Sequence, residues 1–443
     1  MIILIYLFSF LLLISIIVFI HELGHFSFAR LFGVRVLDFS IGFGKPIKSW
    51  ETKSKTVFNL RVLPFGGYVK MKGEEISEKL HSSDSFSSKK YYEKLLITLG
   101  GPFFNFILAV AIFFIINLFG IYKIIPIVGD VLPDSIAYKQ GIEKGDLISK
   151  IDGAKISSFS DAQLVLSKRL GESGDLEIEI LRDENSLEFY LPISNWLTSK
   201  EPSNLLYELG IFPHLEPIIG SVIEASPAAN GGIKPGDKFL EINNKPVTFW
   251  GDIRNEINRS GGNEILIKIL RDKKINILRV EPNLSENNLN WLIGISSSFE
   301  ISNKVRVMEK FSVQNSFKNS ISQTYSVIEN SITFIGKIIF GQVSAKNLGG
   351  PVMIGQYAGE SVIYGGLYSF FYLIALISIS LGIVNLFPLP VLDGGQALIL
   401  TIEKIIGRDL PDRIIEFFYR LGTAFLIFLF VFVFINDIFR ILS

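Results

Sequence analysis

Long apolar segments constrain this chain more than any other feature of its sequence. Four of them are long enough to cross the hydrocarbon core of a membrane, which takes about 20 apolar residues in a helix. They lie at roughly residues 2–22, 95–120, 365–388 and 417–436. The third is not interrupted by charge, because residues 361–392 contain no charged side chain. We therefore expect a polytopic α-helical membrane protein with four transmembrane helices.

The first apolar segment could instead be a cleaved signal peptide. Such a peptide has positive charge at its start and a small-residue cleavage site after its apolar part. Residues 2–20 contain no Asp, Glu, Lys, Arg or His, and no such cleavage site follows them. We therefore expect this span to be retained.

The charge balance and the cysteine content narrow the classes of partner and of metal site. The chain has 43 basic and 43 acidic residues, so nothing suggests a nucleic-acid partner. It has no cysteine, which excludes disulfides and zinc sites built on thiolates.

The connections between the spans predict the orientation of the chain. Residues 26–93 are rich in Lys and Arg, and the connection after the third span adds Lys404, Arg408 and Arg413. By the positive-inside rule both connections face the cytoplasm. The insert at 121–360 then lies outside, as do both chain ends, because large domains cross the membrane largely regardless of their own charge.

The outer insert contains an internal repeat. "IVGDVLPDSIAYKQGIEKGDLISKIDGAKI" (127–156) aligns without a gap on "IIGSVIEASPAANGGIKPGDKFLEINNKPV" (218–247). Each copy continues into alternating apolar strands, which predicts two related, mostly β modules at 121–212 and 213–300.

The repeated pattern resembles PDZ domains in the arrangement seen in bacterial proteases. PDZ domains bind peptides by adding a strand to the edge of a sheet. The other reading is that the modules only cover or position something, and the sequence does not show which copy would bind a ligand. Residues 301–360 then have a helical pattern of apolar residues, which predicts an amphipathic helix that lies on the membrane surface or packs on the modules.

The stretch "VFIHELGHFSF" (18–28) places polar groups at the end of the first apolar segment. His21 and His25 are four residues apart and share one face of a helix, so their rings can hold one Zn²⁺ with Glu22 beside it. A chance match at a helix end is the alternative. It is weak, because the chain has only four histidines and polar groups in an apolar segment are costly unless they have a function.

Asp393 is the best candidate for a third zinc ligand. Catalytic zinc usually has three protein ligands, and a carboxylate is a common third. Asp393 ends the charge-free third span and is followed by Gly394 and Gly395. The first and third spans run in the same direction, so His21 and Asp393 should reach the same depth of the membrane. An ordinary loop aspartate is the alternative.

These motifs together resemble the site-2 protease family of intramembrane zinc metalloproteases. The chain is most similar to the bacterial branch typified by the regulator of sigma-E protease, with tandem PDZ domains between the second and third spans. The resemblance covers nearly the whole chain. The stretches that carry it are "HELGH" (21–25), "FSIGFGKP" (39–46), "LPFGGYVKM" (63–71), "GGPFFNFILA" (100–109) and "NLFPLPVLDGG" (385–395).

The resemblance assigns roles to individual residues. It implies His21, His25 and Asp393 as ligands of one Zn²⁺, and Glu22 as the general base that activates the attacking water. It also implies that "LPFGGYVKM" forms a membrane-reentrant β-hairpin whose edge holds the substrate as an extended strand. The residues expected to bind substrate are Gly66, Gly67, Tyr68, Asn385 and Pro388.

Some of these residues have structural alternatives. Without the resemblance, Gly66 and Gly67 read as a plain cytoplasmic turn, and Asn385 as a polar contact between helices. In "GGPFFN" the glycines favour close helix packing, and Asn105 is a further candidate for the site.

The resemblance implies an endoprotease that cuts transmembrane segments of single-span proteins in regulated intramembrane proteolysis. Its substrates would be anti-sigma factors or signal-peptide remnants already shortened on the outer side, with the PDZ pair as a size filter or docking site. The protein would span the bacterial inner membrane, in contact with lipid, with its active site near the cytoplasmic side. The alternative is a non-proteolytic membrane scaffold whose PDZ pair binds peptide ends. The expected segments are a first membrane half (1–120), the two modules (121–212 and 213–300), the amphipathic region (301–360) and a second membrane half (361–443).

Overall fold

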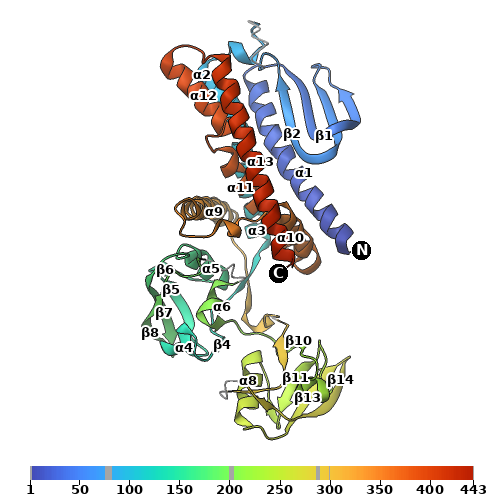
Figure 1. Cartoon of the computed structure of the whole chain (residues 1–443), viewed down its shortest axis with the longest axis vertical. Helices are drawn as coiled ribbons and strands as arrows, with labels where there is room; N and C mark the ends of the chain where they lie inside the picture. Colours follow the sequence, from blue (N-terminus) through green and yellow to red (C-terminus); the bar gives the residue numbers. More distant parts are fainter. Residues whose placement is uncertain (1, 75–81, 199–203, 286–289, 299, 443) are drawn as a thin grey trace. The chain divides into compact units, whose positions relative to one another are not determined.

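The structure is a computed structural model that describes residues 2–74, 82–198, 204–285, 290–298 and 300–442 (Figure 1). The chain folds into two units. The first comprises Met1–Ile121, Lys310–Ile338 and Ser344–Ser443, and the second comprises Tyr122–Glu309 and Ile339–Val343.

In the described part of the chain, four helices are long and apolar enough to cross a membrane. They are α1 (Ile2–Leu31), α3 (Gly100–Phe119), α11 (Gly366–Asn385) and α13 (Asp412–Leu442). All four belong to the first unit, and they confirm the four predicted spans. Helix α1 runs well past the predicted end at residue 22, until Gly33 leaves the helix with a φ of 69°. The HELGH motif therefore lies inside a continuous helix and not at its end.

Helices α1, α3 and α11 pack against one another around an apolar core. Its fully buried members include Leu13, Ala109, Phe113, Ile374 and Ile379. The α1–α3 contact is close at two glycines, because a Cβ built on Gly24 would lie 2.1 Å from the carbonyl oxygen of Gly100. This approach brings the HELGH turn of α1 against the start of α3.

Helix α13 holds the beginning of α10 (Pro351–Tyr364) through one buried carboxylate. Asp437 Oδ1 accepts from the backbone N–H of Gly350, and Oδ2 accepts from Val352 and Met353, each at 3.0 Å. The first N–H groups of a helix have no partner within it. A side chain of α13 supplies those partners for α10.

Among the described residues, five further elements complete the helical part of the first unit. They are the 3₁₀ turns η1 (Phe86–Ser88) and η3 (Ala345–Asn347) and the helices α2 (Tyr91–Thr98), α9 (Val313–Ile339) and α12 (Asp393–Ile406). Helices α2 and α12 pack together, with the Tyr91 hydroxyl 3.0 Å from Thr401 Oγ1. Helix α9 buries small hydroxyl side chains such as Ser320 and exposes apolar ones such as Phe317, so it is amphipathic.

Strands β1 (Val36–Glu51) and β2 (Val57–Met71) pair with each other in one sheet beside α1 (Figure 1). Both strands bend sharply, so the sheet has four strand segments. Residues 36–41 are central, because they pair with residues 67–71 on one side and with residues 57–60 on the other. The bends occur where glycines take positive φ angles, at Gly42, Gly44 and Gly66.

The outer segments of this sheet have different surroundings. Residues 46–51 pair only with the segment that begins at Val57 and form one edge. The segment that ends at Met71 forms the other edge. Val69 and Met71 of this second edge are buried in an apolar cluster that includes Ala29 of α1. The second edge is therefore the one held against the HELGH helix.

The second unit contains the predicted repeat as two similar modules. The first has β4 (Asp130–Val131), α4 (Ile136–Lys139), β5 (Leu147–Ile151), β6 (Ala154–Lys155), α5 (Phe159–Ser167), β7 (Gly174–Arg182), β8 (Asn185–Ile193), α6 (Leu205–Leu209) and β9 (Ile211–Phe212). The second has β10 (Ile219–Val222), α7 (Pro227–Asn230), β11 (Lys238–Ile242), β12 (Lys245–Pro246), α8 (Trp250–Arg259), β13 (Ile265–Arg271), β14 (Lys274–Val280), β15 (Asn283–Leu284), β16 (Trp291–Leu292) and β17 (Ile295–Ser297). Strand β3 (Ile121–Ile124) pairs with β18 (Arg306–Glu309), which follows the 3₁₀ turn η2 (Asn303–Val305).

The two modules share their topology and an ion pair between an arginine and a buried aspartate. Their main sheets have the equivalent orders β6-β5-β7-β8 and β12-β11-β13-β14. In the first module Arg182 donates from Nε to Asp146 Oδ1 at 2.7 Å. In the second module Arg271 does the same to Asp237 Oδ1 at 2.6 Å. Both aspartates are 1% exposed, so each "GD" of the repeat anchors the end of a strand by the same contact.

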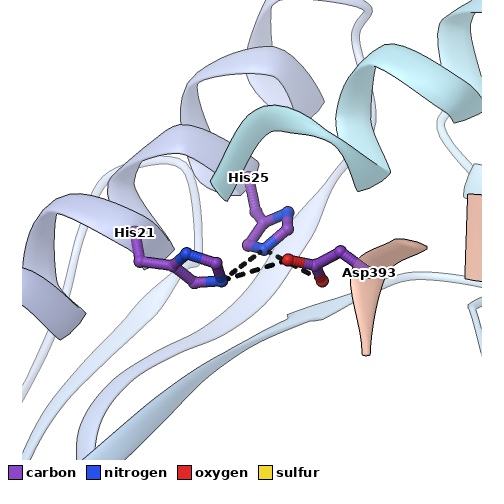
Figure 2. Close-up of side chains that lie close together, drawn as sticks. All are labelled: His21, His25 and Asp393. Atoms are coloured by element: carbon purple, nitrogen blue, oxygen red, sulfur yellow. Dashed lines mark hydrogen bonds and ion pairs between the residues drawn. The ribbon is translucent and has the colours of Figure 1, made fainter. Parts of the chain in front are cut away.

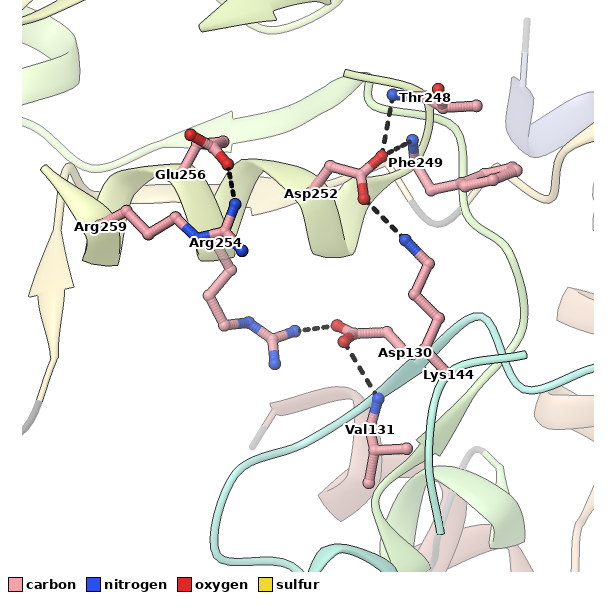
Figure 3. Close-up of polar contacts among 9 residues, drawn as sticks. All are labelled: Asp130, Val131, Lys144, Thr248, Phe249, Asp252, Arg254, Glu256 and Arg259. Atoms are coloured by element: carbon pink, nitrogen blue, oxygen red, sulfur yellow. Dashed lines mark hydrogen bonds and ion pairs between the residues drawn. The ribbon is translucent and has the colours of Figure 1, made fainter. Parts of the chain in front are cut away.

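Two ion pairs join the modules to each other (Figure 3). Arg254 Nη2 of α8 lies 2.5 Å from Asp130 Oδ2 of the first module, and Lys144 Nζ lies 2.7 Å from Asp252 Oδ1. A cavity of about 220 Å³ lies beside them, lined by residues of both modules that include Phe212.

Candidate active site

The structure brings His21, His25 and Asp393 together, and Figure 2 shows the three side chains pointing toward one another. His21 Nε2 lies 3.2 Å from Asp393 Oδ2, and His25 Nε2 lies 3.5 Å from Asp393 Oδ1. The two Nε2 atoms are 3.3 Å apart. One ligand atom from each residue lies within 4.8 Å of the others. Two imidazoles and a carboxylate at this spacing can hold one metal ion.

Asp393 reaches the histidines because the chain folds back sharply after α11. That helix ends at Asn385 and α12 begins at Asp393. The fold needs glycine at the two following positions. A Cβ on Gly394 would lie 2.2 Å from the carbonyl oxygen of Leu386, and one on Gly395 would lie 2.1 Å from that of Leu389.

His25 is oriented by the backbone at the end of α2. Its Nδ1 lies 2.9 Å from the carbonyl oxygen of Ile97, an atom that can only accept. Nδ1 therefore carries the proton, and Nε2 keeps its lone pair toward Asp393. Metal-binding histidines are typically held in this way, with the second ring nitrogen donating to an acceptor.

His21 is oriented by two amide side chains. Asn105 Nδ2 lies 3.1 Å from His21 Nδ1, and Asn385 Nδ2 lies 3.3 Å from His21 Nε2. Asn105 is fully buried, and its Oδ1 has no hydrogen-bond partner among the described residues. Half a turn of this amide exchanges its oxygen and nitrogen. Oδ1 can then accept from His21 Nδ1–H, which frees the Nε2 lone pair.

Gly101 of α3 leaves room for the two imidazoles. A Cβ at this position would lie 2.4 Å from His25 Nε2 and 2.6 Å from His21 Nε2. The close packing predicted for "GGPFFN" is therefore present, and it occurs directly against the candidate ligand atoms.

Glu22 and the candidate ligands line one pocket of about 310 Å³. Its other lining residues are Gly67, Tyr68, Val69, Met71, Glu74, Thr98, Asn385, Val391, Leu392 and Gln396. Glu22 is only 8% exposed, and a Cβ on Gly67 would lie 2.9 Å from its Cγ. The pocket thus joins the HELGH helix to the sheet edge and to the chain before α12.

The sequence analysis singled out some of these residues and missed others. His21, Glu22, His25, Asp393, Gly67, Tyr68 and Asn385 lie in the pocket. Asn105 contacts His21 but is not part of the pocket lining, and neither are Gly66 and Pro388. Glu74, Thr98 and Gln396 were not foreseen. Glu74 had a signal in the sequence, because it is the first acidic residue after "LPFGGYVKM".

Comparison with known proteins places this site in a family context. The model of "Peptidase family M50" matches residues 9–429. The chain is 33% identical to the regulator of sigma E protease of Haemophilus influenzae and 30% identical to the regulator of sigma-E protease RseP of Escherichia coli. It is also 33% identical to a putative zinc metalloprotease of Pasteurella multocida. Each alignment covers 98% of both chains.

The family match includes all four apolar helices except the ends of the first and last, and it includes every candidate ligand. A membrane protein with a histidine pair on one helical face and a carboxylate beside it has the parts that a metallopeptidase needs. The chain therefore belongs to peptidase family M50 and is a metalloprotease of the site-2 type.

Proposed function

We propose that this chain is a zinc-dependent endoprotease that cleaves transmembrane segments of single-span membrane proteins within the membrane. The observation that carries the proposal is the convergence of His21, His25 and Asp393 in one pocket with Glu22. The histidines and Glu22 lie on a helix that is apolar enough to span a membrane, so chemistry at this pocket would occur at membrane depth.

The donor set fits a single Zn²⁺. Catalytic zinc takes three N or O ligands from the protein and keeps a further position open. Here the three donors face a common point, and the buried Asp393 Oδ2 lies 3.2 Å from His21 Nε2. His21, His25 and Asp393 would hold the ion. Bound zinc would act as a Lewis acid on the scissile carbonyl and on the attacking water.

Glu22 would move the protons of the reaction. Its neighbour in sequence is a candidate ligand, and its carboxylate lies in the same pocket. It would take a proton from the attacking water and return it to the leaving amine. General acid–base catalysis of this kind contributes about 10²–10⁴-fold to a rate.

The sheet edge that ends at Met71 would bind the substrate. A transmembrane helix hides its backbone in its own hydrogen bonds, so it must unwind before hydrolysis. An edge strand replaces those bonds. Gly67 and Tyr68 lie on this edge within the pocket, and Asn385 lines the same pocket. Gly66 would make the bend that precedes the edge strand, and Pro388 would shape the turn that follows α11.

The two repeat modules would act as PDZ domains on the outer side of the membrane. Their shared topology and the charge distribution of the connecting segments support this role. As a size filter or docking site, they would admit substrates already shortened on the outer side. Relatives with the name "regulator of sigma E protease" support anti-sigma factors as one substrate class. Signal-peptide remnants would be another. The protein would lie in the inner membrane, with its active site near the cytoplasmic side.

Cleavage of a substrate panel tests the proposal. The panel contains single-span proteins with and without a bulky outer domain, incubated with the purified full-length protein, with the Glu22→Gln variant as the blank. We expect cleavage within the transmembrane segment of the shortened substrates only, and none by the variant. Equal cleavage of shortened and full-length substrates would contradict the role of the modules. Cleavage by the variant would contradict the mechanism.

A further inference from the structure

The edge strand of the pocket presents only some of its backbone groups to a partner. In an antiparallel sheet, successive residues direct their N–H and C=O groups to opposite sides of the strand. Lys72 N donates to the carbonyl oxygen of Arg35 at 3.0 Å, so Lys72 faces the central segment. By alternation the backbone N–H and C=O groups of Met71, Val69 and Gly67 point away from the central segment, toward the edge with which no other described strand pairs.

Glu74 already occupies one of these free positions. Its Oε2 accepts from the backbone N–H of Met71 at 3.0 Å. This contact agrees with the alternation, because the N–H group of Met71 points away from the central segment. Glu74 and Met71 both line the pocket that contains Glu22. The edge therefore offers Gly67 and Val69 to a partner, whereas the N–H of Met71 is bonded to a carboxylate.

We propose that Glu74 ends the usable edge of this strand and so sets the register in which a substrate pairs with it. The inference rests on the proposed function, and it makes Glu74 a specificity-determining residue. A substrate strand paired with Gly67 and Val69 cannot continue to Met71. The donor there is taken, and the carboxylate oxygens of Glu74 would repel the carbonyl oxygens of the substrate.

The register decides which peptide bond is cut. A strand that slips by one residue turns its side chains to the opposite face, so the next acceptable register is two residues away. Two residues of strand correspond to about 6.6 Å. A shift of this size would place a different peptide bond against His21 and Glu22. With Glu74 present, one register should dominate, and the enzyme should cut at one position.

The masses of the cleavage products test this proposal. Purified full-length protein is incubated with a single-span substrate that has no bulky outer domain. We expect one cleavage position for the wild type, and for Glu74→Ala a second position two residues away from the first. Glu74→Gln is the matched control. It keeps an oxygen acceptor for Met71 N–H, so it should keep the single position.

The readout separates a role in register from a structural role. Loss of stability would lower the yield of all products and leave their masses unchanged. Glu74 is exposed, so its substitutions should fold. Glu74→Asp offers a second test, because the shorter side chain pulls the carboxylate back from Met71 and should also produce the second product.

The outcomes also separate this inference from the proposed function. A wild type that cuts the substrate at one position, with Glu74→Ala and Glu74→Asp cutting only there, overturns the inference alone. A wild type whose products equal those of the Glu22→Gln blank overturns the proposed function, and the inference falls with it.

Discussion

Both candidate ligand histidines take their orientation from the same stretch of chain around the start of α3. His25 is held by the carbonyl oxygen of Ile97, and His21 by the side chain of Asn105. The two acceptors differ in kind. A carbonyl can only accept, whereas an amide can serve either tautomer of the imidazole. Asn105 can therefore partner His21 both with and without a bound ion.

Substitution of Asn105 should weaken metal binding. Loss of an outer partner of a metal ligand typically costs about 10–100-fold in metal affinity. We expect Asn105→Leu to raise the zinc dissociation constant by that factor, measured by competition with a chelator. Asn105→Asp keeps an acceptor for His21 Nδ1–H, so it should bind zinc at least as tightly as the wild type.

The control for this prediction is Ser378→Ala. Ser378 Oγ donates to the backbone carbonyl of Asn105 at 2.9 Å, so its removal disturbs the α3–α11 contact and leaves the amide in place. Zinc affinity should then stay close to that of the wild type. An Asn105→Leu variant that binds zinc as tightly as the wild type would refute the role of the amide.

At the scale of single residues, the motif and the topology predicted the candidate centre. The i, i+4 spacing placed His21 and His25 on one face, and the direction of the spans placed Asp393 at their depth. The contacts of Asn105 and Glu74 could not be predicted in this way. They depend on which face of α3 meets α1 and on which side of a strand a backbone N–H points, and neither follows from spacing.

At the scale of elements, the joint between α10 and α13 rests on one buried carboxylate. Asp437 is 1% exposed and accepts from three backbone N–H groups where α10 begins, those of Gly350, Val352 and Met353. Removal of an acceptor leaves buried donors unpaired, at about 1–3 kcal/mol for each unsatisfied group. The sequence could not predict this contact, because residues 350–353 and residue 437 lie far apart along the chain and no motif connects them.

We expect Asp437→Ala to lower the free energy of unfolding by no less than the cost of one unsatisfied buried group, about 1–3 kcal/mol. The measurement is the thermal unfolding midpoint of the purified protein in detergent. Glu416→Gln is the control on the same helix. Its ion pair with Arg420 is exposed and 3.7 Å long, so its loss should matter little. Equal midpoints for the Asp437→Ala and Glu416→Gln variants would show that the cap does not hold α10.

The sheet of β1 and β2 shows why element boundaries were only partly predictable. The family resemblance implied a hairpin in "LPFGGYVKM", but residues 67–71 pair with residues 36–41 from much earlier in the chain. The positive φ angles at Gly42 and Gly44 bend β1 and allow the four-segment sheet. Glycine marks such bends in a sequence but does not identify the pairing.

At the scale of the whole molecule, the predicted division into apolar spans and repeated modules follows from sequence periodicity. Four long apolar runs gave the four membrane helices, and self-similarity gave two modules with the same sheet order. The contacts that join the modules could not be predicted from the repeat. Asp130 and Arg254 contact each other but lie in different copies, and the similarity between the copies does not show which residues of one contact the other.

His214 should make the junction between the modules sensitive to pH. The side chain is 9% exposed and its ring centroid lies 4.0 Å from that of Phe249. Burial lowers the pKa of His214, and the nearby cations Lys144 and Lys304 lower it further, against the opposing effect of Asp252. The folded junction therefore favours the neutral ring.

The sign of the effect follows from this lowered pKa. Stability from the neutral ring is present above the ordinary histidine pKa of about 6.5 and is lost as the pH falls through the lower folded value. We expect amide hydrogen exchange around Trp250, whose N–H donates to Leu215, to accelerate at acidic pH beyond the intrinsic change. His214→Phe should remove the excess. The same acid response in this variant would assign it to another group.

The central claim is that Glu22 performs proton transfer beside a metal held by His21, His25 and Asp393. The most direct measurement is the cleavage rate of a shortened single-span substrate by purified wild type and Glu22→Gln, with the zinc content of both preparations. The account predicts equal zinc content and a rate reduced by roughly 10²–10⁴-fold or more in the variant. Cleavage by Glu22→Gln at the wild-type rate would contradict it.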